Sequence, residues 1–264
     1  MNGTTSLFTG LIASCVLVGS AWSVEKTAKE ALVSPSSAPV SVVLVHGAFA
    51  DGSSWNKVIP LLQAQGLKVV AVQNPLTSLE DDVAATKRAI DAQAGPVVLV
   101  GHSWGGTVIT EAGNDAKVKA LVYVAAFAPG VGEDTADGGK GFPPPPGLAH
   151  PLASPDGFLT LSDDAIANDF AQDVTPQEAT LIAATQGPVR AANFNQKVTQ
   201  AAWTTKPSWY IVSANDRMIQ PDAERAVARK LKANTTVLPT SHVPMVSRPD
   251  AVAQVILDAV KSSK

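Results

Sequence analysis

Cysteine is almost absent from this sequence of 264 residues. A single cysteine, Cys15, excludes both a disulfide framework and a zinc site built from cysteines. The chain also lacks a large excess of either charge, because it has 20 Lys and Arg and 23 Asp and Glu. It contains no long basic run. Nucleic-acid binders draw most of their affinity from neutralised phosphates, so this balance argues against a nucleic-acid partner.

Charged side chains are missing from the first 24 residues, and the apolar segment 7–22 is shorter than the roughly 20 residues of a stable membrane span. This segment ends in Ala21-Trp22-Ser23, with small residues at the −3 and −1 positions of a signal-peptidase site. We therefore predict a signal peptide at 1–23 and an exported protein, periplasmic or secreted. A lipid anchor on Cys15 and an uncleaved cytoplasmic extension are the alternatives.

The rest of the chain alternates between strand and helix patterns. Residues 24–39 predict a polar linker, and the folded domain spans 40–264. Six apolar, β-branched runs predict strands at 40–45, 67–72, 97–100, 120–125, 209–212 and 235–238. Helical spacing lies between and after them, at 54–65, from Ser78 to Gly95, 222–232 and 250–260. This order predicts an α/β fold with a mostly parallel sheet of about six strands and helices on both faces.

The alternation breaks at about 129–205. This segment begins with glycines and the proline run 143–146, and continues with helical patterns at 163–172 and 175–186. A long insertion directly after a sheet strand favours a cap, or lid, over a pocket. The alternative is a surface excursion without function.

The sequence Gly101-His102-Ser103-Trp104-Gly105 fits the G-x-S-x-G pattern of a nucleophile elbow. It lies between a predicted strand and an apolar helical stretch, which is the context that gives the pattern meaning. A sharp strand-to-helix turn would present the hydroxyl of Ser103 at the carboxyl edge of the sheet. We predict that Ser103 is a nucleophile; the alternative is a tight structural turn.

A serine nucleophile needs a base, and the chain has four histidines. His102 adjoins Ser103 and should point away from its hydroxyl, His46 should hold a loop by a hydrogen bond, and His150 lies in the proline-rich segment. His242 follows the last predicted strand, at the same sheet edge as Ser103. We therefore predict that His242 is the base.

The base needs a carboxylate to orient it. Asp216 follows the predicted strand 209–212 and lies between Ser103 and His242 in chain order, as in α/β hydrolases. Asp222 and Glu224 are rival acids, but their position after Pro221 is typical of the first turn of a helix.

Two backbone N–H groups should hold the oxyanion of the tetrahedral intermediate. One is expected from Trp104, directly after the nucleophile, and the other from the loop 46–49. Gly47 would let that backbone pass close to a substrate. The glycines at 47–52 do not form a phosphate loop, because no Lys-Ser/Thr follows them.

Together these motifs resemble the α/β-hydrolase superfamily over nearly all of 40–264. The resemblance rests on VVLVHGAFADGSSW at 42–55, on GHSWGG at 101–106, on Asp216 with a proline five residues on, and on SHVPM at 241–245. The chain is most similar to the branch of plant methylesterases, hydroxynitrile lyases and related bacterial esterases. This resemblance implies a Ser103–His242–Asp216 triad and an oxyanion hole from the N–H groups of Ala48 and Trp104. It also implies a helical cap between the sixth and seventh strands of the family's sheet.

Two positions depart from the lyases of this branch. The pattern typical of these lyases has Thr at the position of Gly47 in this chain. It has Lys directly after the catalytic histidine, where this chain has Val243. Without that hydroxyl and that ammonium, departing cyanide would lack its supports. The resemblance therefore implies an esterase rather than a lyase.

We expect a serine hydrolase, carboxylesterase-like, that needs no cofactor or metal and cleaves a small to medium ester through an acyl-enzyme. Apolar residues of the insertion favour an apolar substrate, although they could instead pack the insertion: Phe142, Leu148, Phe158, Phe170 and Trp203. A cofactor-free perhydrolase and a non-catalytic small-molecule receptor of the same fold are the alternatives. Amides, lactones and thioesters would use the same residues, and no oligomeric state is predicted.

Overall fold

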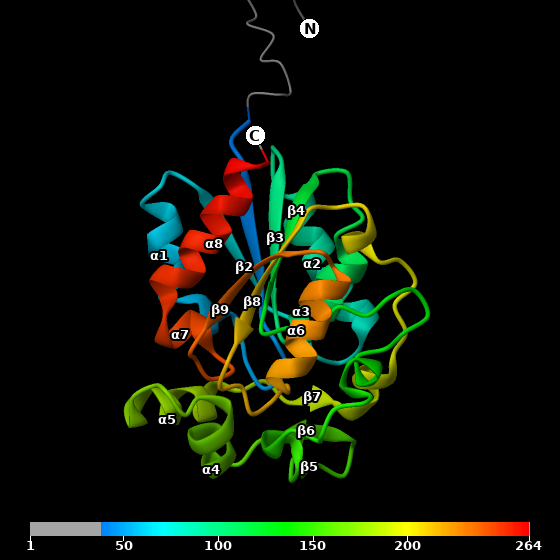
Figure 1. The fold of residues 1–264 in the computed structure, drawn as a ribbon, viewed down its shortest axis with the longest axis vertical. Coiled ribbons are helices and arrows are strands. Elements are labelled where there is room, and N and C mark those ends of the chain that lie inside the picture. The colour runs from blue at the N-terminus through cyan, green and yellow to red at the C-terminus, as the bar shows by residue number, and fades with distance from the viewer. Residues whose placement is uncertain (1–37, 264) are drawn as a thin grey trace, which may run out of the picture. The chain divides into compact units, whose positions relative to one another are not determined.

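A computed structural model describes residues 38–263 (Figure 1). The predicted signal peptide at 1–23, Cys15 and most of the predicted linker lie outside the described residues. The predictions of export and of a lipid anchor therefore stay predictions.

The main sheet has six parallel strands in the order β2-β1-β3-β4-β8-β9. Its strands are β1 Ser41–Val45, β2 Lys68–Val72, β3 Val97–His102, β4 Val118–Val124, β8 Ser208–Ser213 and β9 Asn234–Leu238. Every residue of β1, β3 and β8 is buried, which explains their continuous apolar runs. The edge strands β2 and β9 are partly exposed. The predicted α/β architecture with six strands is confirmed.

Helices cover both faces of this sheet (Figure 1). They are α1 Val58–Gln63, α2 Leu79–Asp91, α3 Trp104–Ala112, α6 Pro221–Lys230, α7 Pro244–Ser247 and α8 Pro249–Lys261, with a 3-10 turn, η2, at Gly52–Trp55. α1 packs on α8, and α2 packs on α3. α2 begins where predicted, with Ser78 as its cap accepting the N–H of Asp81 at 3.0 Å, but it ends at Asp91, before Gly95. In residues 38–263 no helix has both the length and the apolar character to cross a membrane.

The segment predicted as an insertion leaves the main sheet after β4 and returns at β8. It contains α4 Asp163–Ala165, the π-helix η5 Ile166–Phe170, α5 Pro176–Thr185, and the 3-10 helices η3 Ala136–Gly139, η4 Pro146–Leu148, η6 Ala191–Asn195 and η7 Ala202–Thr204. It also contains an antiparallel sheet of β5 Leu152–Ala153, β6 Phe158–Thr160 and β7 Val189–Arg190. Much of it lies at the end where the main strands terminate (Figure 1).

One feature of the insertion differs from the prediction. The three-stranded sheet was not predicted, because strands of two or three residues are too short to show a period of two. The resemblance places the cap between the sixth and seventh strands of the family's sheet. In this chain the interval lies between β4 and β8, which are the fourth and fifth of the six described strands in chain order.

Candidate active site

Ser103 occupies a strained turn between β3 and α3. Its φ of 51° and ψ of −121° fall in a region that residues other than glycine rarely adopt. The surrounding structure holds this conformation, since the Ser103 carbonyl accepts the N–H groups of Gly106 (2.9 Å) and Phe127 (3.2 Å). The turn directs the Ser103 side chain into a cavity. The predicted elbow geometry is thus present.

The glycines of the elbow are required by close backbone approaches. A Cβ atom on Gly101 would lie 2.5 Å from the carbonyl oxygen of Gly105, and one on Gly105 would lie 2.6 Å from that of Val45. Both distances are too short for van der Waals contact. Any larger residue at either position would therefore displace the turn that carries Ser103.

His242 and Asp216 form a buried pair at the carboxyl edge of the sheet, on the loops after β9 and β8. Nδ1 of His242 donates to Oδ2 of Asp216 at 2.5 Å, and both side chains are almost fully buried. The other oxygen, Oδ1, accepts the backbone N–H groups of Met218 (2.6 Å) and Ile219 (2.9 Å). Asp216 is the acceptor in all three hydrogen bonds. They also fix the tautomer of His242 with a proton on Nδ1, which leaves Nε2 free to act as a base.

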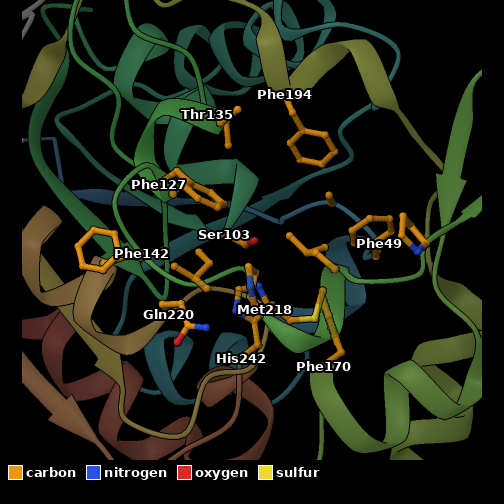
Figure 2. A pocket seen from close by; sticks show the side chains of 18 of the residues that line it. Phe49, Ser103, Phe127, Thr135, Phe142, Phe170, Phe194, Met218, Gln220 and His242 are labelled. Carbon is orange, nitrogen blue, oxygen red and sulfur yellow. The ribbon is translucent and has the colours of Figure 1, made fainter.

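Ser103 and His242 line the same cavity, and Figure 2 shows the Ser103 hydroxyl near its centre with His242 beside it. No hydrogen bond joins the two side chains among the described residues. Such contacts are often long before substrate binds and shorten in the reacting complex. The structure therefore brings the three predicted side chains to one site, with the Asp216–His242 contact already formed.

The other histidines are placed as predicted. Nε2 of His46 accepts the N–H of Asn74 at 2.9 Å and its Nδ1 donates to the carbonyl of Gly47 at 2.8 Å, so His46 ties two loops together. Burial lowers its pKa. His150 is exposed.

His102 has a role that sequence reasoning missed. It is fully buried, and its Nε2 donates to the backbone carbonyl of His242 at 2.8 Å. Burial holds the pKa of His102 well below its usual value, so it is an uncharged donor. His102 thus supports the loop that carries the candidate base, from the residue next to the candidate nucleophile.

The two N–H groups predicted to form the oxyanion hole are available to donate hydrogen bonds to a ligand. The N–H groups of Ala48 and Trp104 find no acceptor among the described residues. The loop of Ala48 passes close to the elbow, because a Cβ atom on Gly47 would lie 2.8 Å from Cβ of Ser103. Phe49, next in this loop, has a φ of 57° and lines the same cavity.

The cavity has a volume of about 320 Å³ and an apolar lining. Its aromatic walls come partly from the insertion, and Figure 2 shows the rings around Ser103: Phe49, Phe127, Phe142, Phe170 and Phe194. Thr135 and Gln220 add polar groups, and no Asp, Glu, Lys or Arg lies among its described lining residues. An uncharged, apolar ligand suits such a lining.

The predicted apolar residues of the insertion divide into two groups. Phe142, Leu148 and Phe170 line the cavity, as expected for a substrate-binding role. Phe158 and Trp203 do not: Phe158 lies under the Arg190 guanidinium, and Trp203 lies near Lys230 and donates to the carbonyl of Pro129. For these two, packing of the insertion is the better interpretation.

Asp82 is a buried acid beside the site that the sequence did not reveal, because its position is typical of an acid in the first turn of α2. It is fully buried, its Oδ2 accepts the indole N–H of Trp104 at 2.7 Å, and its Oδ1 accepts the N–H of Leu76 at 2.7 Å. Burial raises the pKa of Asp82 from its usual 3.8 to about 6, against the two hydrogen bonds. Asp82 therefore anchors the side chain of Trp104, the residue directly after Ser103.

This pKa makes a prediction for stability. A carboxyl group whose pKa is higher in the folded protein than in the unfolded protein stabilises the fold at pH values below its unfolded pKa. This contribution is lost as the pH rises through the folded pKa. For Asp82 the loss is about 2 kcal/mol between pH 4 and pH 7. Asp82→Asn should remove this pH dependence, so its free energy of unfolding, measured in urea, should approach or pass that of the wild type as the pH rises. A difference between the two proteins that stays constant with pH would contradict this.

The two rival acids prove to be unlike each other. Both lie in the first turn of α6, as predicted. Asp222 is exposed and pairs with Arg225 at 3.1 Å. Glu224 is fully buried and accepts the N–H of Ser213 at 2.9 Å, so its interpretation as an ordinary helix-start acid is wrong.

Within the described part of the chain, no group of three His, Cys, Asp or Glu side chains is arranged to hold a metal ion.

Comparison with known proteins places the chain in a family. The model of the alpha/beta hydrolase family matches residues 42–255, and the chain belongs to this family. A probable hydrolase of the fungus Phoma is 28% identical, over 82% of this chain and 96% of its own length. A pyrethroid hydrolase of Sphingobium wenxiniae is also 28% identical, over 82% and 86%. The crystal structure of a pyrethroid hydrolase from Sphingobium faniae aligns with a TM-score of 0.73 at 21% identity, over 85% of this chain and 98% of that one.

Proposed function

We propose that this protein is a serine hydrolase that cleaves uncharged, apolar carboxylic esters through an acyl-enzyme. The observation that carries the proposal is the buried Asp216–His242 pair opening onto the cavity that contains the strained Ser103. Ester hydrolysis is supported by the names of three relatives, which are a probable hydrolase, a pyrethroid hydrolase and a methylesterase.

The proposed reaction begins when Nε2 of His242 takes the proton of the Ser103 hydroxyl as Oγ attacks the ester carbonyl carbon. The N–H groups of Ala48 and Trp104 donate to the resulting oxyanion. The imidazolium, stabilised by Asp216, then returns the proton to the leaving alcohol, and the acyl group stays on Ser103. Water, deprotonated by His242, attacks the acyl carbon, and the imidazolium returns the proton to Oγ of Ser103 as the acid leaves.

The cavity supports the proposed substrate class. Burying a charge without a partner is costly, and the lining offers an ionised substrate no opposite charge. We further propose that 129–205 acts as the lid of this cavity, since Phe142 and Phe170 contribute to its walls. An aromatic or branched alkyl ester would fill it with ring and methyl contacts.

A panel of p-nitrophenyl esters tests this proposal. We expect kcat/KM for uncharged acyl groups such as butyrate or benzoate to exceed that for a similar acyl group with a terminal carboxylate by at least about 100-fold, the equivalent of about 3 kcal/mol. Labelling by a fluorophosphonate probe should accompany turnover. A protein that binds these esters but neither turns them over nor reacts with the probe would instead be a receptor.

A further inference from the structure

A second buried carboxyl, that of Glu224, contacts the Asp216 side chain. Its Oε2 accepts the N–H of Ser213, the last residue of β8, so Glu224 joins the start of α6 to the end of that strand. This hydrogen bond therefore links the two ends of the loop that carries Asp216. The second oxygen, Oε1, is buried and receives no N–H or O–H from the described residues. The Glu224 carboxyl lies within hydrogen-bonding reach of the Asp216 side chain.

Two ionised carboxylates cannot hydrogen-bond to each other, so a buried pair in contact holds a proton between them. The hydrogen bonds indicate where that proton resides. Asp216 accepts three hydrogen bonds, from His242, Met218 and Ile219, so both of its oxygens already serve as acceptors. Glu224 accepts one, from Ser213. The proton therefore belongs to Glu224.

We propose that Glu224 is a positioning residue: as an uncharged carboxylic acid it donates a hydrogen bond to the Asp216 carboxylate and holds it toward His242. This inference rests on the proposed function, in which Asp216 orients the base. It leaves one negative charge in the buried pair, which matches the one positive charge that His242 acquires during attack.

The surroundings of Glu224 agree with this state. Burial, and next the negative charge of Asp216, raise the pKa of Glu224 well above its usual value. Arg225, the next residue on its helix, acts in the opposite direction and is the weaker influence. Tyr210, on the neighbouring β8, donates to the carbonyl of Ala126 at 2.5 Å, and burial raises its pKa well above 10, so it stays uncharged.

The test compares Glu224→Gln with Glu224→Leu, and uses Asp222→Asn as a control from the same helical turn. Glutamine can donate to Asp216 through its amide N–H and accept the N–H of Ser213, so kcat should stay within about threefold of wild type. Leucine can do neither, and kcat should fall by about 10- to 100-fold with KM little changed, since a hydrogen bond to a charged group is lost. Asp222→Asn should have no effect.

The acidic limb of the pH profile of kcat/KM separates this role from a merely structural one. If Glu224 is uncharged, Glu224→Gln removes no charge, and the midpoint of the limb should stay within about 0.3 pH units of wild type. If Glu224 were ionised, the same substitution would remove a buried negative charge next to the Asp216–His242 pair. The limb would then move to lower pH by about one unit or more, which would overturn the proposal.

Infrared spectroscopy provides a readout that needs no activity. At pH 8, well above the pKa of about 6 of Asp82, the wild type should show the carbonyl band of a protonated carboxylic acid, which Glu224→Gln lacks and Asp222→Asn keeps. Absence of this band in the wild type, or full activity of folded Glu224→Leu, would overturn the proposal. If Ser103→Ala remained active while the band was present, the proposed function would fail independently of the protonation state of Glu224.

Discussion

Replacing Ser103 with alanine is expected to reduce kcat for ester hydrolysis by about 10⁴- to 10⁶-fold, because nucleophile and base act as a unit. The substitution removes one oxygen atom that faces the cavity, and alanine can adopt the positive φ at the same cost as serine. The hydrogen bonds of the turn, from Gly106 and Phe127 to the Ser103 carbonyl, are backbone bonds and should remain. Activity is measured with a p-nitrophenyl ester, and the free energy of unfolding in urea should change by less than about 1 kcal/mol.

The variant should also lose all labelling by a fluorophosphonate. Residual turnover above water should come from the oxyanion donors and the binding cavity, which the substitution leaves in place. If folded Ser103→Ala kept a tenth of wild-type activity, Ser103 would not be the nucleophile.

Asp216→Asn is expected to lower kcat by about 10³- to 10⁴-fold with KM little changed. The geometry gives the reason. The two backbone N–H groups of Met218 and Ile219 require an oxygen at Oδ1, which turns the new amide NH₂ toward His242. This NH₂ donates to Nδ1 and forces the proton of the ring onto Nε2, where it blocks proton transfer from Ser103.

Asp222→Asn is the matched control for this variant, since Asp222 is exposed and contacts only the surface residue Arg225 through its charge. Its kinetics should stay within a few-fold of wild type. A nearly silent Asp216→Asn together with an essential Ser103 would show that the enzyme works without this acid.

The main sheet and the elbow could be predicted because both have strong local signals. Strands buried on both faces require continuous apolar runs, and the elbow requires glycines where the backbone approaches most closely, as at Gly101 and Gly105. The chain order of parallel strands then places residues after β3, β8 and β9 at one edge. Ser103, Asp216 and His242 could therefore be brought together without knowledge of any distance.

What the sequence could not reveal depends on packing between distant segments. The acids Asp82 and Glu224 both have the pattern of exposed first-turn residues, yet tertiary packing buries them, against Trp104 and Asp216 respectively. The strands of the insertion are too short to be recognised, and the side chains that line the cavity are chosen by the path of an irregular segment. Phe158 and Phe170 are both phenylalanines of the insertion, but only Phe170 lines the cavity.

The most direct test of the central claim is to locate the covalent intermediate by mass spectrometry. The wild-type protein is mixed with a slowly hydrolysed aryl ester, quenched in acid, digested and analysed for the peptide that contains Ser103. In the wild type, the account predicts that the Ser103 peptide carries the added mass of the acyl group. In Asp216→Asn, the acylated peptide should form at a much lower rate. Full ester turnover with an unmodified Ser103 peptide, or an acyl group on another residue, would contradict it.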